Sequence, residues 1–141
     1  MTDILAVVNA VAAAITTNLA GDVLAKRTYA LSPDSLNPPT AVVVPGPGTF
    51  LTYDDTFDGT GNFAVVVKIL NGSQDSGSSQ KLLLGYMAKT GATSIRAAIL
   101  ADPKLGGICS YMQIPSAENY GDVEWAGQQY LGFELPVGVF G

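Results

Sequence analysis

The sequence contains no histidine, one cysteine and few charged residues. Charged residues make up 13% of the 141 positions, and 12 Asp and Glu against 7 Lys and Arg give a formal net charge of −5. Without histidine, the chain cannot by itself build the usual Ser-His or Cys-His nucleophile pairs or the common Cys/His zinc sites. With Cys109 as the only cysteine, no disulfide can form within the chain, and nothing in the sequence indicates an oxidising compartment.

Basic clusters and long apolar runs are also missing. Lys26 and Arg27 form the only adjacent basic pair, whereas a surface that binds duplex DNA at physiological salt needs several phosphate contacts. The longest apolar run, residues 4–15, is interrupted by Asn9 and is too short to span a bilayer. The first residues lack the basic start of a signal peptide. We therefore expect a protein made in the cytosol that has no membrane span and does not bind DNA tightly.

The apolar residues, 48% of the chain, follow helical spacing in three segments. Residues 3–19 form the first predicted helix, which Gly21 ends. A second helix starts at Ser78 or Ser79 and runs through residue 89, with Leu82, Leu83, Tyr86 and Met87 facing inward. A shorter third helix starts near Thr93 and ends before the Asp-Pro pair at 102–103.

Alternating and β-branched segments predict strands at 23–31, 40–44, 49–53, 62–70 and 108–114, and a final hairpin of 123–125 and 130–140 joined across Gly127. The segment 62–70 is apolar on both faces, which is typical of a central strand in a covered sheet. Pro136 cannot donate to a strand ladder and should lie at an edge or a bulge. The predicted fold class is α+β: a mainly antiparallel or mixed sheet packed against an N-terminal helix and a central helix pair, in a single domain spanning residues 1–141.

The residues that could carry chemistry form no convincing constellation. Asp54, Thr56 and Asp58 imitate the start of a calcium loop, but Val65 occupies the position where such a loop needs a bidentate Glu. A structural loop is therefore favoured over a metal site. Cys109, between apolar and small residues, is interpreted as a core residue rather than a reactive thiol. We predict no catalytic residues, no metal and no cofactor, and a structural protein rather than an enzyme.

Several stretches, in order along nearly the whole chain, resemble the tail terminator family of long-tailed (siphovirus-type) bacteriophages. They are the N-terminal helix followed by Ser-Pro-Asp-Ser-Leu-Asn-Pro-Pro at 32–39 and the strand 40–44; Thr-Tyr-Asp-Asp-Thr-Phe at 52–57 leading into the strand 63–70; the segment 95–107, ending in Asp-Pro-Lys-Leu-Gly-Gly; and Asn-Tyr-Gly at 119–121 with Gln-Tyr-Leu-Gly-Phe-Glu at 129–134. The ordered set carries the resemblance, because each piece alone is a common turn or strand.

This resemblance implies a homo-oligomeric ring, a hexamer in that family, that caps the head-proximal end of the tail tube. Such a ring stops polymerisation of the major tail tube protein and offers a joining surface to the neck proteins of the filled head. Its subunits meet through heterologous contacts whose rotation closes. DNA passes through the centre without specific binding, which suits an acidic or neutral lumen. The implied location is the virion tail, after assembly in the host cytoplasm.

Two groups of residues are candidate contact sites. The loop 54–62 is a candidate lumen or ring-face loop, with an inert hairpin loop as the equal alternative; its candidate residues are Asp54, Asp55, Phe57 and Asp58. Trp125 and Tyr130 are candidate subunit contacts, since large aromatic residues dominate interface energies, although Trp125 could instead pack in the core. Glu134 is either a solvent-facing strand residue or an intersubunit partner of Arg96 or Lys104.

Two other readings of the sequence stay open. A neck or head-completion protein is also a small ring-forming α+β component of the virion, and related folds serve both roles. A small-molecule-binding domain is less favoured, because it would need a pocket with convergent polar groups that the sequence does not indicate.

Overall fold

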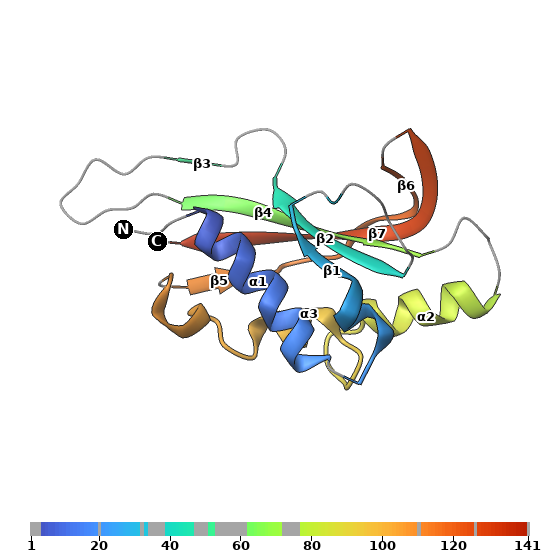
Figure 1. Cartoon of the computed structure of the whole chain (residues 1–141), viewed down its shortest axis with the longest axis horizontal. Helices are drawn as coiled ribbons and strands as arrows, with labels where there is room; N and C mark the ends of the chain where they lie inside the picture. Colours follow the sequence, from blue (N-terminus) through green and yellow to red (C-terminus); the bar gives the residue numbers. More distant parts are fainter. Residues whose placement is uncertain are drawn as a thin grey trace.

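The computed structural model describes residues 4–19, 21–31, 33, 39–46, 51–52, 62–71, 77–109, 111–125 and 127–140. Along the chain these residues form α1 (Ile4–Asn18), the 3-10 helix η1 (Val23–Arg27), β1 (Thr28–Ala30), β2 (Thr40–Pro45), β3 (Leu51–Thr52), β4 (Asn62–Leu70), α2 (Gly77–Met87), α3 (Ile95–Leu100), the 3-10 turn η2 (Leu105–Gly107), β5 (Tyr111–Gln113), β6 (Glu118–Trp125) and β7 (Gln128–Phe140) (Figure 1).

One mixed sheet contains all seven strands of the described residues. The strand order is β1-β2-β4-β7-β5, with β3 also paired to β4 and β6 also paired to β7. Only β1 and β2 run parallel; the other pairs are antiparallel. As predicted, β4 is a central strand with the bounds 62–70, lying between β2 and β7.

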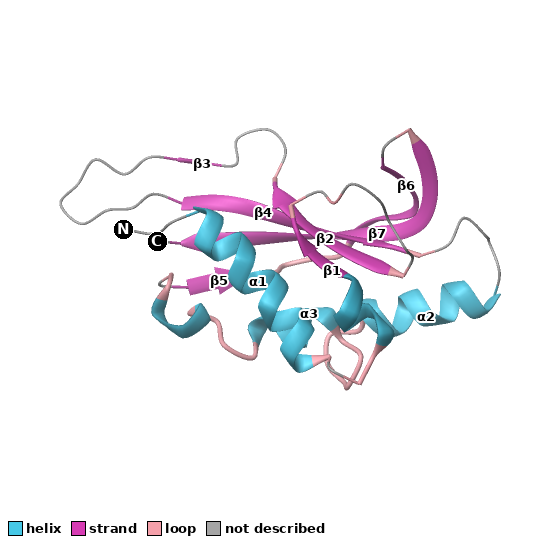
Figure 2. Cartoon of the chain, in the orientation of Figure 1, coloured by secondary structure: helices cyan, strands magenta, loops and turns pink. Residues whose placement is uncertain are grey.

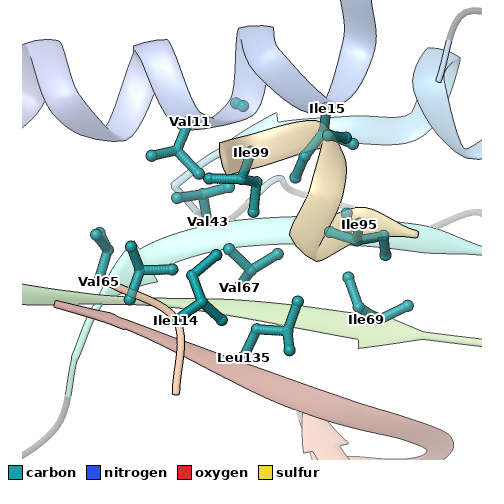
Figure 3. Packing of buried hydrophobic residues seen from close by; sticks show 14 of the residues in the cluster. Val11, Ile15, Val43, Val65, Val67, Ile69, Ile95, Ile99, Ile114 and Leu135 are labelled. Atoms are coloured by element: carbon teal, nitrogen blue, oxygen red, sulfur yellow. The ribbon is translucent and has the colours of Figure 1, made fainter. Parts of the chain in front are cut away.

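The helices lie on one face of this sheet, so the fold is α+β as predicted (Figure 2). Figure 3 shows the core between the two layers, where Val11 and Ile15 of α1 and Ile99 of α3 lie over Val67 of β4. Alternate residues on one face of β7 are all buried: Leu131, Phe133, Leu135, Val137 and Val139. Burial of each such side chain contributes about 1.5–3 kcal/mol, and this burial holds the helices on the sheet.

The segment 23–31 was predicted as a strand, and this prediction is wrong for its first five residues. The Asp22 carboxylate accepts a hydrogen bond from the Leu24 N–H at 2.9 Å and caps a 3-10 turn there. The strand is confined to Thr28–Ala30. The same carboxylate also accepts a 2.7 Å hydrogen bond from the Tyr86 hydroxyl of α2. Asp22 therefore ties the end of the first helical segment to the second helix.

Two further predictions need correction. The predicted strand 108–114 is only Tyr111–Gln113, because a turn that starts at Asp102 continues through Cys109. The Asp102 carboxylate accepts hydrogen bonds from the N–H groups of Lys104 and Gly106. In α2, Leu82 is 37% exposed rather than inward, whereas Leu83 and Tyr86 are fully buried as predicted.

The long strand β7 changes partners along its length, and two residues fit these changes. On one side, Pro136 pairs with Val66 of β4. On the other side of β7, residues 128–134 pair with β6 and residues 138–140 pair with β5, so Pro136 falls in the gap between these two partners. The missing N–H of proline therefore costs no ladder bond, as the edge prediction required. Gly132 pairs with both Leu70 of β4 and Gly121 of β6, and a Cβ at Gly132 would lie 2.1 Å from the Ile69 carbonyl oxygen.

Candidate functional site

The candidate loop residues lie outside the described part of the chain. Asp54, Asp55, Phe57 and Asp58 fall within residues 53–61, so the lumen-loop hypothesis stays a prediction. The calcium-like pattern falls in the same segment. Within the described ranges, no group of three His, Cys, Asp or Glu side chains is arranged to hold a metal ion.

Glu134 is engaged within its own chain. Its carboxylate lies 3.8 Å from the Lys68 ammonium across the β4–β7 pair and accepts a hydrogen bond from the Asn119 amide of β6. The two charged side chains remain 30% and 21% exposed, so solvent still screens the pair. Glu134 thus joins three strands, which neither the solvent-facing nor the intersubunit prediction anticipated.

Trp125 and Tyr130 lie on a two-stranded extension of the sheet. Residues 128–131 of β7 lie before the stretch that β4 reaches and pair with residues 122–125 of β6. We call these two segments the ribbon; it projects from the rest of the sheet on the side away from α1 (Figure 1). Trp125 and Tyr130 are both half-buried, and the Tyr130 hydroxyl lies 3.2 Å from the side-chain oxygen of Gln128. Trp125 is therefore outside the hydrophobic core, and both aromatics are partly available for contact.

The ribbon also carries two exposed carboxylates. Asp122 and Glu124 are two positions apart on β6 and so lie on the same side of the strand, roughly 7 Å apart along it. Val123 between them is buried. In the part of the chain that the structure describes, neither carboxylate has a cationic partner. The ribbon therefore presents two unpaired negative charges on one face, whereas Trp125 and Tyr130 lie with Val123 on the other face.

Arg96 lines a surface pocket with a volume of about 450 Å³. The pocket lies between the end of α2 and the start of α3 on one side and residues 111–117 on the other. Its apolar wall includes Met87, Ile114 and Leu135, and its polar wall includes Lys89, Arg96 and Gln113. The Arg96 Nε–H donates to the Ile114 carbonyl at 3.0 Å, which fixes the guanidinium at the pocket while leaving its other N–H groups as donors.

The charge of this pocket is unlike that of the chain as a whole. Lys89 is exposed, and among the described residues neither Lys89 nor Arg96 has an ion-pair partner. No carboxylate belongs to the pocket lining; Glu118 lies nearby and accepts a 2.8 Å hydrogen bond from Ser116 on the rim. An acidic protein thus has one hollow with two unpaired cations. The sequence did not reveal it, because α2, α3 and the segment after β5 meet only in the folded chain.

Cys109 is buried and belongs to the core, as predicted, although it lies in a turn rather than a strand. Burial raises the pKa of its thiol, the Asp102 charge adds to that effect, and a hydrogen bond with the Tyr111 backbone opposes it. A thiol with a raised pKa is a weak nucleophile at neutral pH. The position of Cys109 therefore fits a packing role.

Comparison with known proteins gives no family assignment. No protein-family model matches the chain, and the search of curated proteins finds no match. Among the helices of the described residues, none is long and apolar enough to cross a membrane.

Proposed function

We propose that this chain is a structural protein of a long-tailed bacteriophage, the subunit of a ring that caps the head-proximal end of the tail tube. The ring stops addition of further tube subunits and provides the surface to which the neck is joined. The ordered resemblance along the sequence is the starting point for this proposal, and the α+β fold with helices on one sheet face is compatible with it.

The observation that carries the proposal is the projecting ribbon. A two-stranded hairpin is only marginally stable by itself in water, and an exposed edge strand invites pairing with other chains. Among the described strands, none pairs with the outer edge of β6. A ribbon of this kind gains stability when a neighbouring subunit covers it, which is the situation of every subunit in a closed ring.

Exposed apolar side chains support several contact surfaces on one subunit. Leu5 on α1, Leu84 on α2, Tyr111 on β5 and Tyr120 on β6 are 45–59% exposed and belong to different elements. A ring subunit between the tube and the neck has two neighbours in its own ring and one partner above and below. Such a subunit needs separate contact surfaces rather than a single patch.

The test is negative-stain electron microscopy of lysates from a phage whose copy of this gene carries an early stop codon. Overlong tail tubes without attached heads are the expected result, because nothing would end tube polymerisation. The matched control is the same phage grown in cells that express the wild-type chain, which should restore tails of normal length.

Two other results would contradict the proposal in different ways. Tails of normal length beside filled, unattached heads would assign the chain to the neck. Intact infectious particles from the mutant phage would exclude both virion roles and direct attention to a ligand for the pocket.

A further inference from the structure

The pocket and the ribbon carry opposite charges that their own chain leaves unpaired. Lys89 and Arg96 converge on a hollow whose remaining wall is apolar or uncharged. Asp122 and Glu124 stand exposed on one side of β6. Opposite charges of this kind steer two surfaces together and fix their register.

The two surfaces of one chain are too far apart to meet each other. The pocket lining ends at Ala117, one residue before β6 begins, and Glu124 lies seven residues further along this strand. At about 3.3 Å per residue, the strand carries the Glu124 carboxylate roughly 20 Å away from the pocket. Pairing between these cations and these carboxylates therefore requires two molecules.

We propose that the pocket receives the ribbon of a second copy of this chain, so that Asp122 and Glu124 of one subunit pair with Lys89 and Arg96 of the next. This inference rests on the proposed ring function and names the contact that would close the ring. Because the two partner surfaces are different, the contact is heterologous, and its repetition gives a ring when the rotation closes.

The surroundings of the charges fit the same contact. On the face of the ribbon that carries the two carboxylates, the exposed Gln129 lies opposite Glu124, while Trp125 and Tyr130 lie on the other face. Met87, Ile114 and Tyr111 offer apolar surface around the cations. Aromatic and arginine side chains at the centre of an interface contribute most of the binding energy. The charge pairs therefore set the orientation of the proposed contact, and Arg96 with the apolar wall of the pocket forms its centre.

The decisive experiment uses two opposite charge reversals, Lys89→Glu and Glu124→Lys. In a solution of either variant alone, every contact places two like charges together, and we expect the dissociation constant to rise at least about tenfold. In an equimolar mixture, the reversed pocket of one variant accepts the reversed ribbon of the other, while the two unchanged surfaces also match. An alternating ring with an even number of subunits then has only matched contacts.

Association is measured by sedimentation velocity at several protein concentrations and at low and physiological salt. The expected result is association of the wild-type chain that weakens with salt, loss of association in each variant, and recovery in the mixture and in the double variant. Lys26→Glu, an exposed reversal of the same sign outside the pocket, is the control and should associate like wild type. Circular dichroism checks that every variant folds.

The same variants are expressed in cells infected by the phage that lacks the gene, so that a ring requiring the tail tube as a template is also tested. Each variant alone should fail to restore plaques, and the pair together should restore them. Lack of recovery by the mixture in solution and in infected cells would overturn the proposed contact.

The results separate this contact from the proposed function. If the mixed variants associate again in solution but the phage lacking the gene makes tails of normal length, the contact is established and tail termination is refuted. If the phage lacking the gene makes overlong tails but the mixed variants do not associate or restore plaques, tail termination is supported and the contact between pocket and ribbon is refuted.

Discussion

Replacement of Gly132 by alanine tests whether the two halves of the sheet depend on one close backbone approach. An added Cβ would lie 2.1 Å from the Ile69 carbonyl oxygen, with the Leu70 Cα at 3.4 Å. Carbon–oxygen contacts in sheets are about 3.3–3.6 Å, so β4 and β7 must separate by roughly 1.2 Å at this point. The clash is with backbone, and no side-chain rotation can relieve it.

The expected cost follows from what that separation breaks. The neighbouring hydrogen bond from the Asn71 N–H to the Leu131 carbonyl is 2.8 Å long and would stretch beyond about 3.5 Å, where it is lost. One or two backbone hydrogen bonds at about 1 kcal/mol each, together with about 1–3 kcal/mol for overpacking, give a loss of about 2–5 kcal/mol. For a chain of this size, the melting temperature should fall by about 10 °C or more.

The assay is urea unfolding followed by far-ultraviolet circular dichroism, which reports on the whole sheet rather than on the single tryptophan of the ribbon. The matched control is Gly138→Ala on the same strand, where the nearest atom to an added Cβ is 3.7 Å away. This control should change the free energy of unfolding by less than about 0.5 kcal/mol. Equal stability of the Gly132 and Gly138 variants would refute the reasoning about the close approach.

Three further outcomes are expected. Tyr86→Phe removes the hydroxyl that donates to Asp22 and should cost about 1–2 kcal/mol in urea unfolding at pH 7. Burial, the hydrogen bond to Asp22 and the Asp22 charge raise the pKa of Tyr86 above the ordinary value of 10.0. Tyr86 therefore ionises first in the unfolded chain, and the free energy of unfolding should fall as the pH rises above about 10. This fall should be shallower in Tyr86→Phe, and the same dependence of stability on pH in both proteins would contradict the prediction. The Cys109 thiol should react with a disulfide reagent much more slowly in the folded chain than in urea, and equal rates would show that it is accessible. Glu134→Gln should change stability by less than about 1 kcal/mol, because the pair with Lys68 is partly exposed; an unchanged melting temperature with lost self-association would instead support the intersubunit role.

The elements that the sequence predicted correctly are those whose pattern is set by burial on a large surface. Strand β4 is central because β2 and β7 pair with its two edges, and Val65, Val67 and Ile69 of β4 pack in the core together with one face of β7. Helix α1 likewise buries one stripe on the sheet. In these segments local pattern and tertiary packing agree, which is why periodicity alone located them.

The segments that sequence reasoning missed are decided by single polar contacts. The apolar run after Asp22 has the composition of a strand, but the Asp22 carboxylate holds its start in a 3-10 turn. The turn after α3 depends on the Asp102 side chain and on the positive φ of Gly106. The aspartate preceding Val23 was a readable capping signal. From one sequence, it is not possible to judge whether a few side-chain hydrogen bonds outweigh the strand preference of an apolar segment.

The candidate site could be predicted only in part, and for a related reason. Trp125, Tyr130 and Arg96 stand out as residue types that favour interfaces, and the structure places them on the ribbon and in the pocket. Nothing in the sequence singles out Lys89, because the pocket that it lines forms only where residues 111–117, about 25 positions further along the chain, pack near it. The ion pair of Glu134 with Lys68 was not predicted, because it is defined only by the register of β4 and β7.

The distribution of charge suggests why a ring of this protein would form at the right place. Charge pairs of this kind set orientation and association rate more than affinity, and the ribbon face that carries Asp122 and Glu124 brings no aromatic anchor to the contact. Contacts of this kind are weak one at a time, but simultaneous binding to a neighbour and to an underlying surface raises the effective concentration of the second contact. A subunit built in this way associates in solution only at high protein concentration, and it assembles at lower concentration where a tube end holds several copies together. Because each single contact is weak, few rings form away from a tube end. We therefore expect the salt-sensitive contact between pocket and ribbon to determine when the ring assembles as well as its geometry.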